Sequence, residues 1–138
     1  MESKMQKIKE WMEKCPYLNN GKINVDYLKD KPQSYSIDRT PTQPEVYNFV
    51  DGSGGKRQIS FDFTVTAPLS SQAIVNLANS KFCEDFMEWV SIQNRAKSFP
   101  DIKGAFSIKC TSPGYVLQKT ETTAIYIIQM NFTYYEFL

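Results

Sequence analysis

Carboxylates are the side chains of this chain whose type and spacing come closest to acid and base chemistry. Glu84, Asp85 and Glu88 fall within one helix-length segment, where neighbouring carboxyl groups could give and take protons. They lie off the apolar stripe of that segment, which favours a solvated helix face over an active site. Three further carboxylates sit on the polar sides of predicted strands, and the spacing identifies no partner for them: Asp26, Asp38 and Asp62. We therefore expect no catalytic residue.

The chain of 138 residues contains no histidine. Serine and cysteine nucleophiles that depend on a histidine base are therefore excluded, and the sequence predicts a protein that is not an enzyme. Cys15, Cys83 and Cys110 are odd in number and lack metal-ligand spacing, which predicts buried free thiols. We expect no metal and no cofactor.

A glycine-rich run at 51–56 is the one segment with the composition of a phosphate-binding loop. It lacks the spacing of the nucleotide-binding motif, and a predicted strand follows Lys56 where that motif would have a helix N-terminus. The run therefore predicts a flexible hairpin tip between two strands, at 46–50 and 57–66.

The elements that would carry these side chains follow from hydrophobic periodicity. Ile59, Phe61, Phe63 and Val65 alternate with polar residues, which indicates a strand with one apolar face. An apolar stripe at helical spacing predicts one long helix from about 74 to 97, and an N-cap serine at Ser3 begins a short helix at about 3–14. Further strands are predicted at 23–27, 35–39, 106–110, 115–118 and 123–137.

The last predicted strand is apolar on one face throughout and on both faces where it begins, at Ile125 and Ile127. Since the long helix can cover only one face of a sheet, we expect the first helix, or a neighbouring subunit, to cover the other. The predicted fold is α+β: a mostly antiparallel sheet of about five to six strands, with one long helix and a short N-terminal helix packed on it.

Composition places residues 1–138 in a single domain. Hydrophobic residues make up 41% of the chain and the formal net charge is +1, values that disfavour a general nucleic-acid binder. The N-terminal residues are charged, with no apolar signal region, so we expect a protein that stays in the cytoplasm and does not enter a membrane.

The order of elements resembles that of the tail terminator proteins of tailed bacteriophages and of phage-tail-like contractile (R-type) bacteriocins. The likeness covers nearly the whole chain. It rests on this order, on Trp89–Arg95 closing the long helix, and on an aromatic terminal strand from Tyr126 to Tyr135.

The resemblance implies a structural subunit that forms a hexameric ring on the last ring of a tail tube and ends tube and sheath growth. Its implied partners are other copies of itself, the tail tube protein, the sheath protein and, in a virus, the head connector. It would assemble in the cytoplasm of the bacterial host and then form part of the particle. A virus and a headless bacteriocin both remain open, as do contractile and non-contractile tails.

A closed ring needs two different complementary patches on each subunit. One candidate interface lies on or beside the hairpin, where charges of both signs gather: Glu45, Asp51, Lys56 and Arg57. A second lies in the threonine-rich segment 111–123, at Lys119 and Glu121. Three cations are candidates for a lumen facing passing DNA in a viral tail, without specific nucleic-acid recognition: Arg39, Arg95 and Lys97.

Two other functions remain open from the sequence. The chain could be a different phage morphogenesis component, such as a head-tail connector or a baseplate part. It could also be a small-molecule-binding module, in which the long helix and the sheet enclose an apolar pocket. The residues that would line that pocket are Phe61, Phe63, Phe86, Trp89 and Tyr126.

Overall fold

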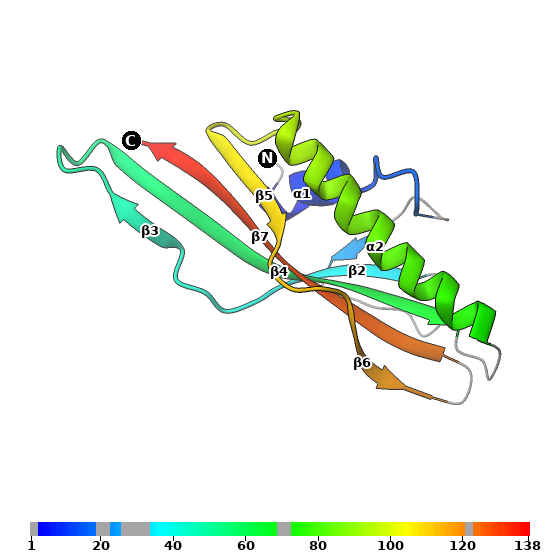
Figure 1. Ribbon diagram of the computed structural model, residues 1–138. Helices are drawn as coiled ribbons and strands as arrows, with labels where there is room; N and C mark the ends of the chain where they lie inside the picture. The colour runs from blue at the N-terminus through cyan, green and yellow to red at the C-terminus, as the bar shows by residue number, and fades with distance from the viewer. Residues whose placement is uncertain (1–2, 19–22, 26–33, 69–72, 121–122) are drawn as a thin grey trace.

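The computed structural model describes residues 3–18, 23–25, 34–68, 73–120 and 123–138. These ranges form an α+β fold, as the sequence predicts (Figure 1). The elements in chain order are α1 (Lys4–Met12), β1 (Asn24–Val25), β2 (Ser34–Arg39), β3 (Glu45–Asn48), β4 (Gly54–Pro68), α2 (Ala73–Arg95), β5 (Ala105–Cys110), β6 (Tyr115–Lys119) and β7 (Thr123–Phe137).

The centre of the sheet is an antiparallel pair of long strands, β4 and β7. They stay in register along their whole length, from Gly54 opposite Phe137 to Pro68 opposite Thr123. Strands β2 and β3 both pair with the outer side of β4, and β5 and β6 both pair with the outer side of β7. Within the described ranges six strands, β2 to β7, thus form an antiparallel sheet, and the short β1 joins β2 in parallel.

Alternation along β4 and β7 determines which side chains are buried. Phe61, Phe63 and Val65 face the helices, and their register partners on β7 face the same way, since directly opposed residues share a face. Phe63 is fully buried, and its ring centroid lies 4.6 Å from that of Phe86 on α2. The apolar alternation therefore builds one continuous core between the sheet and α2.

Helix α1 begins as the sequence predicts, because the Ser3 hydroxyl accepts a hydrogen bond from the Gln6 backbone N–H at 3.1 Å. Its position is not the predicted one. The Trp11 and Trp89 rings lie 4.8 Å apart, and the Trp11 indole donates to the Ser98 carbonyl at 2.8 Å. Both helices therefore pack on one face of the sheet (Figure 1). Of the two alternatives for the opposite face, cover by α1 is wrong, and cover by a neighbouring subunit stays a prediction.

The face of the sheet opposite α1 and α2, called here the far face, is mostly polar. Asn131 donates from its amide to Ser60 at 3.0 Å and to Gln58 at 3.2 Å, and the Ser107 and Thr133 hydroxyls share a hydrogen bond of 2.6 Å. These bonds satisfy short polar side chains that β7 presents between its two neighbours. The far face therefore needs no helix along this stretch.

One end of the sheet extends beyond α2. Each of β4 and β7 has 15 residues, which span about 50 Å, whereas the 23 residues of α2 span about 35 Å. Figure 1 shows β3, the start of β4 and the end of β7 projecting away from α2. We call this part, residues 45–58 with 133–137, the projecting end.

Candidate assembly surface

Aromatic side chains cluster at the projecting end: Tyr47 and Phe137 are exposed, Phe49 and Tyr135 are half-buried, and the exposed Phe106 joins them from β5. Phe49 stacks with Tyr135 and with Phe137 at ring-centroid distances of 6.2 and 6.1 Å, and Phe106 meets the edge of Tyr135 at 5.3 Å. Tyr47, 47% exposed, contacts Phe49 at 6.0 Å, and Phe137 is 61% exposed. We call these five residues the distal aromatic patch. An exposed cluster of aromatic rings is typical of a binding surface.

Strand register explains why the patch gathers on the far face. Tyr47 lies opposite Lys56, which lies opposite Tyr135, so the three side chains share a face. The Lys56 ammonium lies 4.7 Å above the centre of the Phe106 ring, in a cation–π contact. Lys56, predicted as an interface residue, therefore contacts the patch from within β4 and does not lie in the hairpin tip.

Arg57 is the predicted interface residue that the structure places differently. Its side chain points to the helix-covered face and is only 8% exposed. Its guanidinium lies 3.6 Å from a Glu136 carboxylate oxygen and donates to the Tyr47 carbonyl at 3.1 Å. Arg57 thus holds the three strands of the projecting end together. The sequence prediction required an exposed charge at this residue, and Arg57 is not one.

The hairpin tip is shorter and more ordered than the predicted flexible run. It comprises residues 49–53, because β4 begins at Gly54. Asp51 accepts hydrogen bonds from the Ser53 backbone N–H at 3.0 Å and from its hydroxyl at 2.7 Å, which lower the pKa of the Asp51 carboxyl. Glu45 and Asp51, two other predicted interface residues, are exposed.

The second predicted interface lies on β6 at the other end of the sheet. All five residues of β6 are exposed, including the predicted Lys119. Glu121 lies outside the described residues. The connection to β7 is closed by Thr120, whose backbone N–H donates to the Thr123 carbonyl at 2.8 Å.

The three cations predicted for a lumen lie on different elements. Arg39 is the last residue of β2. Burial raises the pKa of the nearby Tyr134 phenol, and the positive charges of Arg57 and Arg39 act in the opposite direction. Arg95 ends α2, where its guanidinium donates to the Ser91 hydroxyl at 3.1 Å, and Lys97 follows with a positive φ of 58°. No shared surface for the three emerges from these positions.

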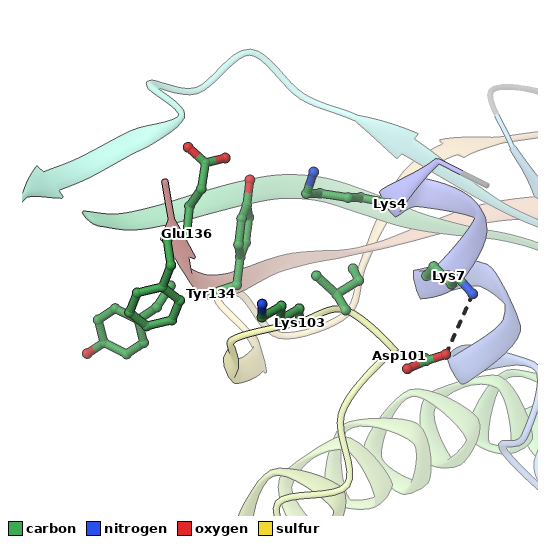
Figure 2. A pocket seen from close by; sticks show the side chains of 9 residues that line it. Lys4, Lys7, Asp101, Lys103, Tyr134 and Glu136 are labelled. Atoms are coloured by element: carbon green, nitrogen blue, oxygen red, sulfur yellow. Dashed lines mark ion pairs between the residues drawn. The ribbon is translucent and has the colours of Figure 1, made fainter. Parts of the chain in front are cut away.

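A pocket of about 280 Å³ lies between the start of α1, the 101–103 segment and the end of β7. Figure 2 shows Lys7 paired with Asp101, at 3.6 Å, and Lys4 beside the Tyr134 ring, 5.4 Å from its centre. Its charged lining differs from the predicted apolar pocket. Phe61, Phe63 and Phe86 instead pack in the core with exposed fractions of at most 1%, and Trp89 and Tyr126 are partly buried against it.

The carboxylates on the helix behave as the sequence predicts. Glu84 and Glu88 are exposed, and Asp85 pairs with Lys81 at 2.8 Å across one helical turn. The strand carboxylates include one pairing that the sequence did not reveal, because Asp38 and Asp62 lie directly opposite each other in the ladder of β2 and β4. Partial burial, and then repulsion by Asp38, raise the pKa of Asp62.

This pairing predicts a stabilising substitution. The folded-state pKa of Asp62 is raised above its ordinary value of 3.8, so the fold favours the protonated carboxyl. The protein is therefore most stable with respect to this group below pH 3.8, and it loses that stability as pH rises through the folded-state pKa. We expect Asp62→Asn to raise the free energy of unfolding at pH 7, by less than about 1 kcal/mol because solvent screens the pair. Urea unfolding at pH 7 and pH 3 measures this, and a gain of equal size at pH 3 would contradict the explanation.

The three cysteines are free, as predicted; Cys15 and Cys83 are buried and Cys110 is partly buried. Burial raises the pKa of Cys15 and Cys83 to about 11 and that of Cys110 to about 12. Within the described ranges, no group of three histidine, cysteine, aspartate or glutamate residues could hold a metal ion.

These thiols predict slow labelling and a loss of stability in alkali. At pH 8 we expect a disulfide reagent to modify the folded protein at least about tenfold more slowly than the urea-unfolded chain, because the thiolate is the reactive form. Since the folded pKa values exceed the ordinary 9.0, the thiol contribution to stability is present below pH 9 and falls toward pH 11. Equal labelling rates for folded and unfolded protein would show that the thiols are accessible.

No protein-family model and no curated protein matches this chain. Among the helices in the described ranges, none is both long enough and apolar enough to cross a membrane.

Proposed function

We propose that this protein is a structural subunit that forms a ring, hexameric by its resemblance to tail terminators, and caps the tube of a phage or phage-tail-like particle. The projecting end carries this proposal. It holds exposed aromatic rings on three strands, β3, β4 and β7, that extend beyond α2, and the single chain leaves these rings uncovered.

The geometry supports an interaction role over a catalytic one. A cation accompanies the aromatic rings on the far face, since the Lys56 ammonium lies over the Phe106 ring. Exposed aromatic rings are enriched at protein interfaces. We assign the distal aromatic patch to contact with the tail tube ring. By the resemblance to tail terminators, we propose assembly in the host cytoplasm and a place at the end of a tube.

The test is tube growth in the presence of the protein. Purified tail-tube protein from the same gene cluster is polymerised with and without the chain, and tube lengths are measured by electron microscopy. We expect shorter tubes that carry extra density at one end. The double variant Tyr47→Ala, Phe137→Ala should lose this effect, whereas Lys81→Ala on the exposed side of α2 should keep it. Tubes of unchanged length with bare ends would overturn the proposal and favour another morphogenesis role.

A further inference from the structure

The two outer edges of the sheet carry the strands with the greatest exposure. Every residue of β3 and of β6 is exposed, and no described strand pairs with their outer sides. Val46 is 44% exposed on β3, and Leu117 is 58% exposed on β6, each at a β-bulge in its strand. An exposed apolar edge strand invites pairing with another chain.

The directions of these strands suit a repeated contact between identical copies. Strand β3 is antiparallel to β4 and β4 to β7, so β3 runs in the same direction as β7, whereas β6 runs against it. In two copies with the same orientation, side by side, β6 of one copy and β3 of the next therefore run antiparallel. The two strands also lie on opposite edges of the sheet. Such a contact is heterologous, which is the kind that closes into a ring.

Charge and pleat select one register for this contact. Antiparallel pairing with Glu45 opposite Lys119 brings together the acidic residue of β3 and the basic residue of β6, both exposed. Glu45 shares the helix-covered face with Arg57, and Lys119 shares it with Ala124, so the opposed side chains point to the same face, as an antiparallel ladder requires. The same register places Asn48 opposite Val116, and these two also share that face.

We infer that the ring is built by strand addition, in which β3 of one copy pairs antiparallel with β6 of the next, with Glu45 opposite Lys119. This inference rests on the ring assembly proposed above and names the residues that make it. The distal aromatic patch stays on the far face of the projecting end, next to this contact, because Tyr47 and Lys119 point to opposite faces.

The contact also determines how far neighbouring copies are displaced. Glu45 lies opposite Arg57 on β4, and Arg57 lies opposite Tyr134 on β7, whereas Lys119 lies opposite Ala124. Tyr134 and Ala124 are ten residues apart, or about 33 Å along β7. Each copy is therefore shifted along its neighbour by that length. In a closed ring such a shift tilts the strands relative to the ring axis, as shear does in a closed barrel.

The test is a disulfide between engineered cysteines. The double variant Glu45→Cys, Lys119→Cys, oxidised mildly at micromolar concentration, should give a ladder of linked chains on a non-reducing gel. The pairing raises the effective thiol concentration to the millimolar range, so at micromolar protein linking should be roughly a thousandfold faster than random collision. The native thiols interfere little, because burial raises their pKa values to about 11 or 12.

The matched control is Glu45→Cys, Lys109→Cys. Lys109 is also exposed on this edge of the sheet, but it lies opposite Asn131, seven residues or about 23 Å along β7 from the partner of Lys119. We expect no ladder from this pair, because a disulfide needs Cα atoms within about 7 Å. Equal ladders from the two pairs, or none from either, would overturn the inference.

Charge exchange provides a second test that creates no thiol. Glu45→Lys and Lys119→Glu alone should each weaken assembly at least about tenfold by opposing like charges, and the two together should restore it. Failure of the double variant to restore assembly would count against the register. Rings without the cysteine ladder would refute strand addition and leave the capping proposal standing. A ladder together with uncapped tubes would refute capping and leave strand addition standing.

Discussion

Phe63→Ala is expected to lower the free energy of unfolding by about 3 to 5 kcal/mol, the largest loss that we predict for a single substitution. Phe63 is fully buried at the centre of β4, and its ring contacts both Phe86 on α2 and Tyr35 on β2. Removing the ring leaves a cavity where three elements meet, and close-packed neighbours collapse into it only partly. Domains of this size have total stabilities of about 5 to 15 kcal/mol, so the variant loses a large part of the whole.

The measurement is urea or thermal unfolding beside Phe137→Ala as the matched control. The control removes the same ring from a residue that is 61% exposed, and should cost less than about 1 kcal/mol. In the tube-capping assay we expect the reverse order. Phe137→Ala should weaken capping more than Phe63→Ala, because Phe137 belongs to the distal aromatic patch and Phe63 does not. Equal stability losses would contradict the division between a buried core and an exposed patch.

Gly54→Ala is expected to open the projecting end without unfolding the domain. Gly54 has a φ of 137°, and a Cβ atom there would lie 1.9 Å from the Glu136 carbonyl oxygen, so the backbones of β4 and β7 would have to separate. We expect a local cost of about 3 kcal/mol, and therefore roughly hundredfold faster hydrogen exchange of nearby amides. The amides to follow are those of Phe49, which donates to the Gly54 carbonyl, and Leu138, which donates to the Ser53 carbonyl, both at 2.8 Å.

Gly52→Ala is the control for the opening of the projecting end. Gly52 also has a positive φ, of 76°, but a Cβ atom there would meet nothing within 4 Å, so only the strained backbone conformation contributes. Its cost should be about 1 kcal/mol, with β4 and β7 still paired. If both variants exchange at the same rate, close strand approach is not what requires glycine at residue 54.

Local periodicity was sufficient to predict most of the elements. The alternation around Phe61 predicts a buried strand, and the predicted terminal strand at 123–137 has the bounds that β7 shows. The predicted strand at 57–66 begins three residues after the observed start of β4, because Gly54 and Gly55 resemble a flexible tip. They are strand residues whose missing side chains allow close approach: a Cβ atom on Gly55 would lie 2.2 Å from the Tyr47 carbonyl oxygen.

Features that depend on long-range register were not predictable in the same way. Arg57 follows a glycine-rich run and therefore resembles a surface cation. Its ion-pair partner, Glu136, lies 79 residues later in the chain, on β7. The opposition of Asp38 and Asp62 likewise requires the register of β2 with β4. A signal for the distal aromatic patch was present, since Tyr47 and Phe49 alternate in the predicted strand at 46–50 and Tyr135 and Phe137 alternate in the terminal strand. Only the pairing of both strands with β4 brings these signals together.

The sequence pattern also did not predict which face of the sheet α1 covers. The narrow apolar stripe of α1 shows that the helix packs on something, and Ile125 and Ile127 suggested the opposite face. The contact of Trp11 with Trp89 decides otherwise, because it pairs two helices distant in the chain. Amphipathicity identifies a buried helix face but not the partner that buries it.

Native mass spectrometry of the purified chain over a range of concentrations tests the central claim most directly, because it counts the copies in an assembly. We predict a hexamer whose population grows at the expense of monomer as concentration rises, and that persists when the protein is released from capped tubes. Monomer alone at every concentration, with no larger species recovered from tubes, would contradict it.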